Sequence, residues 1–133
     1  MTAIGPSYNQ IFNRDYPIII ATNRSSAVLL PVRLAFVVGG YVAGQILARK
    51  TSDGLFYKYD NAGAGGLEIA SAILFEPIDA TEFPGGAGSV AAVGIFGGCT
   101  VFKGKLTGWN ADASADLGAK EITDATGVTL LKF

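Results

Sequence analysis

Apolar residues along most of the chain recur in the pattern of β-strands. Residues 32–38 (VRLAFVV) form one such run, and a glycine pair separates it from residues 41–49 (YVAGQILAR). Residues 55–59 (LFYKY) alternate apolar and polar positions, so their side chains lie on the two faces of a strand. The pattern predicts three strands in this part of the chain, joined by glycine-containing turns.

The second half of the chain continues this pattern. Residues 67–78 predict a strand, or a short turn followed by a strand. Residues 89–96 and 99–106 flank Gly97-Gly98, an arrangement typical of a β-hairpin. The last residues, 127–133 (GVTLLKF), predict a closing strand.

One segment, residues 110–127, has the composition of a helix. Asn110 or Asp112 is suited to cap its first turn, and Gly127 is suited to end it. The fold class is therefore mainly β: a small single β-rich domain, like a barrel or a sandwich, with one or two short helices.

Residues 1–31 differ from the rest, because they contain three prolines, polar clusters and no sustained helical period. They predict an extended N-terminal arm that precedes a domain of residues 32–133. Two interpretations stay open: the arm packs on its own domain as edge strands, or it reaches a partner. The triple isoleucine 18–20 favours the partner, because a β-branched run with unpaired backbone is suited to join another sheet.

Composition adds two constraints on the function. Half of the 133 residues are apolar and only 16% are charged, so we expect a partner to cover part of the apolar surface. The net charge of −1 argues against nucleic acid as the main partner, because phosphate binding needs a cationic face.

A membrane span is not expected. Residues 27–48 are long and apolar enough to suggest one, but they contain Pro31, Arg33 and the Gly39-Gly40 pair. These residues divide the segment into two pieces of strand length. The N-terminus also lacks the cationic start and early apolar run of a signal peptide.

Candidate catalytic groups are few. The chain has no histidine, which removes the commonest general base and zinc ligand, so Cys99 lacks the usual base for a nucleophile. In the glycine-rich stretch that begins with residues 61–66 (NAGAGG), Gly63 and Gly65 match the first two glycines of a dinucleotide fingerprint, but Glu68 stands where the third is needed. The chain also has no phosphate-binding Gly-Lys-Ser/Thr. We interpret residues 61–66 as a turn and expect no cofactor, no metal site and no enzymatic activity.

Two further groups of residues are candidates for a functional role. A carboxylate pair drawn from the acids between residues 68 and 82, with Glu76 and Asp79 as the main candidates, would suit a small hydrolase, but no motif fixes the separation that this chemistry needs. Trp109 is suited equally to anchor a core or an interface.

The order of motifs from residue 41 to residue 131 resembles the head decoration proteins of tailed phages, of the lambda decoration-protein type. The motifs are GQILAR (44–49), GLFYKYD (54–60), the glycine-rich step, and ASAILFEPIDA (70–80). A loop, a small hairpin unit, a helix-like stretch and a closing apolar strand follow in the same order. The resemblance covers about two-thirds of the chain.

The resemblance implies a structural virion protein that is made in the host cytoplasm and binds the outer surface of the assembled capsid. It implies a homotrimer at local three-fold sites, with the major capsid protein as partner, and stabilisation of the head against internal pressure. It also implies that the arm adds backbone hydrogen bonds to a capsid strand. On this basis we select the strand-forming arm residues as capsid contacts: Ile11, Phe12, Tyr16, Ile18, Ile19 and Ile20.

An alternative is a tail or fibre module that binds a host-surface glycan through Trp109 and the tyrosines. Copy number per particle separates the two, because a decoration protein covers the lattice and a tail module does not.

Overall fold

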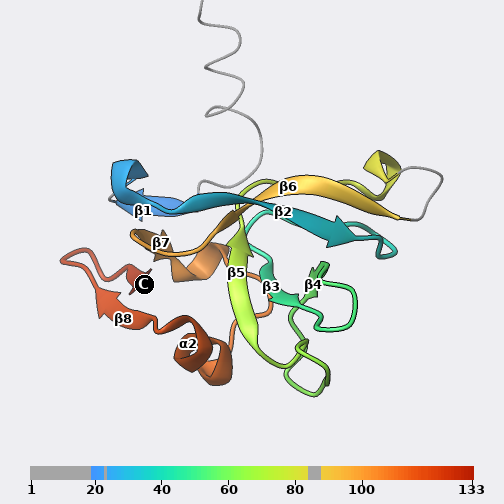
Figure 1. Cartoon of the computed structure of the whole chain (residues 1–133). Coiled ribbons are helices and arrows are strands. Elements are labelled where there is room, and N and C mark those ends of the chain that lie inside the picture. Colours follow the sequence, from blue (N-terminus) through green and yellow to red (C-terminus); the bar gives the residue numbers. More distant parts are fainter. Residues whose placement is uncertain (1–18, 23, 84–87) are drawn as a thin grey trace, which may run out of the picture.

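The computed structural model describes residues 19–22, 24–83 and 88–133, and this part of the chain is mainly β (Figure 1). Five strands form a closed barrel in the order β2 (Leu29–Ala35), β4 (Phe56–Lys58), β3 (Ile46–Arg49), β5 (Ala70–Leu74) and β6 (Ser89–Ile95). A second sheet has the order β1 (Ile20–Thr22), β7 (Thr100–Phe102), β9 (Thr129–Lys132) and β8 (Lys120–Thr123). Within the described ranges, the helices are the α-helix α2 (Ala111–Leu117) and the 3₁₀ turns η1 (Arg24–Ser26), η2 (Ala80–Glu82) and η4 (Lys103–Lys105). The mainly β prediction is confirmed.

The barrel closes unevenly around β2. On one side β2 pairs antiparallel with β6 over its whole length, from Leu29 opposite Ile95 to Ala35 opposite Ser89. On the other side it pairs in parallel with β4 at a single position, Leu34 opposite Phe56. Among the described residues, positions 29–33 therefore have a strand on one side only.

Strand β3 shows how the two sheets share a core. Ile46, Leu47 and Ala48 are all fully buried. Leu47 packs in the barrel interior, whereas Ile46 and Ala48 point outward and pack in a second cluster with Val101 and Leu131 of the four-stranded sheet. Strand β3 is therefore covered on both faces, which explains a continuous apolar run in place of an alternating one.

The described part of the predicted arm belongs to the fold. Strand β1 pairs antiparallel with β7, with Ile20 opposite Val101, and the Ile19 carbonyl accepts a hydrogen bond from the Phe102 amide at 2.9 Å. The side chains of Ile19 and Ile20 are each only 2% exposed. These residues therefore pack on their own domain as part of an edge strand. Their apolar side chains complete the core between the two sheets.

The predicted hairpin around Gly97-Gly98 is wrong. Strands β6 and β7 belong to different sheets, and the glycine pair carries the chain from the barrel to the four-stranded sheet. Gly97 and Gly98 both have positive φ, 133° and 74°, and the Gly98 amide donates to the Phe133 carbonyl at 2.7 Å. Both flanking strands thus find partners elsewhere, so the turn signal marks a change of sheet.

The predicted helix is correct at its start and too long at its end. The Asn110 side chain accepts a hydrogen bond from the Ala113 amide at 2.8 Å, as expected of an N-cap. The helix α2 stops at Gly118, whose φ of 66° is left-handed, and not at Gly127. Residues 120–132 instead form the β8–β9 hairpin, in which β-branched Ile122, Thr123 and Thr129 favour strands over helix.

Candidate docking surface

The glycine-rich residues 61–66 form a turn between β4 and β5, as predicted. The loop packs against the β3–β4 connection, where the Thr51 amide donates to the Gly65 carbonyl at 2.8 Å. Gly66 has a φ of 105°, and a Cβ there would collide with the Arg49 carbonyl oxygen. Its amide donates to the Glu68 carboxylate at 2.8 Å. Glycine is therefore required for this close backbone approach.

Two of the acids considered as a catalytic pair, Asp79 and Glu82, form hydrogen bonds with nearby backbone amides. The Asp79 carboxylate accepts from the Thr81 amide at 3.0 Å, and the Glu82 carboxylate accepts from the Asp79 amide at 2.8 Å. This reciprocal arrangement is a capping box at η2. Asp53 caps the β3–β4 turn, where the Tyr57 hydroxyl donates to it at 2.7 Å and holds the pKa of the Asp53 carboxyl below its ordinary value.

Cys99 is 2% exposed, and burial raises the pKa of its thiol. The thiol therefore remains protonated at neutral pH and serves as a small core residue. Among the described residues, no group of three or more His, Cys, Asp or Glu side chains could hold a metal ion.

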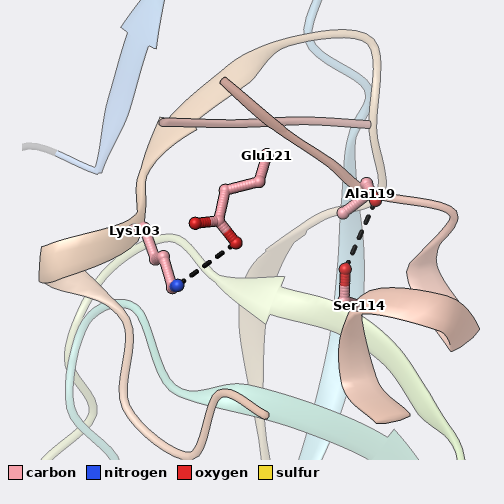
Figure 2. Close-up of polar contacts among 4 residues, drawn as sticks. All are labelled: Lys103, Ser114, Ala119 and Glu121. Atoms are coloured by element: carbon pink, nitrogen blue, oxygen red, sulfur yellow. Dashed lines mark hydrogen bonds and ion pairs between the residues drawn. The ribbon is translucent and has the colours of Figure 1, made fainter. Parts of the chain in front are cut away.

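Trp109 lies at an open hollow of about 400 Å³. The hollow is lined by Lys103, Trp109, Asn110, Ala111, Ser114 and Glu121. Figure 2 shows two of the polar contacts made by the lining residues: Lys103 Nζ lies 3.2 Å from Glu121 Oε2, and Ser114 Oγ donates to the Ala119 carbonyl at 3.3 Å. Trp109 is partly buried against the core, so it contributes both to packing and to the wall of the hollow.

The tyrosines do not form one platform with Trp109 in the described residues. Tyr41 and Tyr59 are 2% and 8% exposed, so their rings belong to the core. Tyr57 lies on β4, where its hydroxyl is held by Asp53.

A more distinctive surface lies at the start of β2. Val28, Leu29 and Leu30 are consecutive apolar residues that are 44%, 40% and 46% exposed, and Pro31 after them is also exposed. We call residues 28–31 the β2 apolar run. Exposed apolar runs of this length are a liability for a free protein unless a partner covers them.

The backbone at the β2 apolar run is also available for contact. Residues 29–31 pair with β6 and have no strand on their other side among the described residues. Pro31 has no amide hydrogen, which suits it to an open strand edge. Sequence analysis did not single out this run, although three apolar residues followed by proline within a strand are a readable signal of an exposed edge.

The structure describes two of the six arm residues that were predicted to contact the capsid. Ile19 and Ile20 are buried in the chain's own core beside β7. Ile11, Phe12, Tyr16 and Ile18 lie outside the described residues.

These features define a class: a small β-barrel protein with an exposed apolar strand edge that is suited to binding another protein. A family model described as bacteriophage lambda head decoration protein D matches residues 31–127. The chain therefore belongs to the lambda head decoration protein D family, and the sequence-based resemblance is confirmed. No curated protein and no solved structure matches the chain.

Membership of this family gives the chain a structural role as a capsid-binding component of a phage head. The family match begins at Pro31, so β1 and residues 28–30 lie outside the matched region. Within the described residues, no helix is long and apolar enough to cross a membrane. The apolar segment 27–48 contains β2 and most of β3.

Proposed function

We propose that this chain binds the outer surface of an assembled phage capsid, as a homotrimer at local three-fold sites, and stabilises the head against internal pressure. The observation that carries the proposal is the family match over residues 31–127. A protein that binds only the assembled lattice stabilises it by mass action, and linked copies gain further from multivalency. This function requires contact area and needs no catalytic group.

We propose two connected contacts with the major capsid protein. The first is the arm, through Ile11, Phe12, Tyr16 and Ile18, with the buried Ile19 and Ile20 anchoring the arm to its own domain. The second is the β2 apolar run, whose exposed side chains and open edge are suited to meet an extended capsid segment.

The first experiment measures the copy number of this chain relative to the major capsid protein in purified particles, by quantitative mass spectrometry. A ratio near one to one is expected of a decoration protein. A handful of copies per particle would favour the alternative, a tail or fibre module that binds a host glycan through the Trp109 hollow. Absence from particles would overturn both.

The second experiment tests the arm. A variant with alanine at Ile11, Phe12, Tyr16 and Ile18 is titrated onto particles that lack the protein, and bound copies are counted. We expect binding at least tenfold weaker than wild type, on the order of 1.4 kcal/mol or more, with an unchanged melting temperature. Val128→Ala, at an exposed position of the β8–β9 hairpin, is the control. Full binding by the quadruple variant would remove the arm from the proposal.

A further inference from the structure

The four-stranded sheet carries a row of apolar residues on the face that points away from the core. Ile122 of β8 lies opposite Leu130 of β9, and Leu130 lies opposite Phe102 of β7. Their neighbours Val101 and Leu131 are buried in the core, so the row lies on the other face, because successive side chains of a strand alternate. Ile122 is 38% exposed, and Phe102 and Leu130 are partly buried but belong to neither of the described core clusters.

A pair of lysines lies beside this row. Lys120 of β8 is directly opposite Lys132 of β9, and each is two positions from the apolar row along its strand. Both therefore project from the same face as the row, with their Cβ atoms roughly 5 Å apart. Glu121, between Lys120 and Ile122, points the other way and contacts Lys103 at the Trp109 hollow (Figure 2). We call Phe102, Lys120, Ile122, Leu130 and Lys132 the outer sheet face.

The lysine pair is unfavourable within the chain itself. Like charges directly opposite one another in a sheet repel, and within the described ranges neither Lys120 nor Lys132 forms an ion pair. A lysine on an edge strand protects that edge against strand addition, which accounts for Lys120. It does not account for Lys132, because β9 is an inner strand between β7 and β8. The pair therefore points to an anionic group that the described residues do not supply.

The apolar row indicates what kind of anion fits. A free inorganic anion would pair with the lysines and leave the row in water, whereas a protein segment with a carboxylate beside an apolar side chain would cover both. The hairpin tip limits the face, because Asp124 there carries a negative charge and accepts hydrogen bonds from Thr126. An acidic partner would be repelled at this tip, so Val128 lies outside the contact.

The outer sheet face adjoins both proposed capsid contacts. The arm enters the fold at β1, which is an edge strand of the same sheet. Phe133, directly after Lys132, accepts a hydrogen bond from the Gly98 amide at 2.7 Å. The adjacent Gly97 carbonyl accepts one from the amide of Val28, the first residue of the β2 apolar run, at 2.8 Å. A capsid surface that receives the arm and the β2 apolar run therefore lies close to the outer sheet face.

We infer that the outer sheet face is a third contact with the capsid, and that it binds an acidic segment of the major capsid protein. Lys120 and Lys132 pair with a carboxylate of this segment, and the apolar row packs against a side chain beside it. A second copy of this chain, turned face to face, would place lysine against lysine. Strands β1 and β9 lie outside residues 31–127, so the family match does not carry this contact. The inference rests on the proposed capsid binding and adds the chemistry of the capsid segment.

Lys120→Glu separates binding from stability. It replaces two like charges by an opposite pair, so the melting temperature is expected to rise by about 1–4 °C. The variant is titrated onto particles that lack the protein, and binding is expected to be about tenfold weaker or more, because the new carboxylate faces an acidic segment. Lys58→Glu, exposed on β4 of the barrel, makes the same change in net charge and is the matched control. It is expected to bind within about twofold of wild type.

Salt dependence is the second readout. Wild-type binding is expected to weaken as NaCl is raised from about 0.05 M to about 0.5 M, because salt screens exposed charges. A variant with Lys120→Gln and Lys132→Gln keeps the length of both side chains and removes their charge. It is expected to bind more weakly at low salt and to change less as salt rises. Equal salt dependence of this variant and wild type would contradict the inference.

The outcomes distinguish this contact from the decoration function. If wild type decorates particles and Lys120→Glu binds no more weakly than Lys58→Glu, the contact is wrong and the decoration function stands. If Lys120→Glu weakens self-association in analytical ultracentrifugation and leaves particle binding unchanged, the outer sheet face meets another copy and the inference falls. If wild type does not bind particles, the decoration function falls and the inference falls with it.

Discussion

Ile20→Ala tests whether β1 is an integral part of the fold. The Ile20 side chain is 2% exposed and packs in the core cluster that joins the two sheets. Replacement by alanine removes the branches beyond Cβ, at about 0.8 kcal/mol for each buried carbon, and leaves a cavity that adds to this cost. We expect a loss of about 3 kcal/mol of unfolding free energy, which lowers the melting temperature by roughly 10 °C for a domain of this size.

The assay is urea unfolding followed by circular dichroism, with a thermal scan as a second measurement. Ile122→Ala is the matched control, because Ile122 lies on β8 at the opposite edge of the same sheet and is 38% exposed. We expect the control to lose less than about 1 kcal/mol. If Ile20→Ala lost no more than the control, β1 would be a loosely attached strand and Ile20 would not anchor the arm.

Three further predictions test local features of the fold. Asn110→Ala should cost about 1–2 kcal/mol in urea unfolding, because it removes the α2 cap and the acceptor of the Tyr59 hydroxyl, and Asn110→Asp should restore most of this loss. Gly66→Ala should lower the free energy of unfolding by more than about 2 kcal/mol, because the new Cβ collides with the Arg49 carbonyl oxygen. Gly65→Ala is the control: its φ of 69° is also positive but it has open space around it, so it should lose only about 1 kcal/mol. Equal losses would show that the contact with the Arg49 carbonyl does not matter. Burial raises the pKa of the Cys99 thiol, so its stabilising contribution is complete below the pKa of an unfolded thiol, about 8.5, and is lost as pH rises toward the folded pKa. Cys99→Ala should therefore flatten the fall of the urea midpoint between about pH 8 and 10, and parallel pH profiles would contradict this assignment.

Local patterns identified the parts of the chain where a short segment decides its own structure. The strict alternation of residues 55–59 marked β4, and the Asn110 cap marked the start of α2. The glycine-rich residues 61–66 were recognised as a turn because their spacing fits no phosphate-binding motif. In each case the deciding contacts lie within a few residues of one another.

Features that depend on distant partners could not be predicted in this way. The Gly97-Gly98 step resembles a hairpin turn, yet β7 pairs with β1 and β9, from opposite ends of the chain. The end of the predicted helix was wrong for a local reason, because Ile122 and Thr123 favour the strand that pairs with β9. The burial of Ile19 and Ile20 depends on a core formed by both sheets, so the sequence showed their strand propensity without showing which chain would cover them.

Strand β2 joins the β2 apolar run to the core of the barrel. Its inward side chains Val32 and Leu34 are 3% and 0% exposed and fix the strand in the barrel, while the apolar residues at its start remain exposed. A free chain would expose this run to water, at a cost in solubility. On a capsid lattice, contact with an extended capsid segment would cover it. The arm is anchored to the same fold through Ile20, which is 2% exposed. Contact of the arm with the capsid would therefore bring the β2 apolar run close to the capsid without further ordering of the chain.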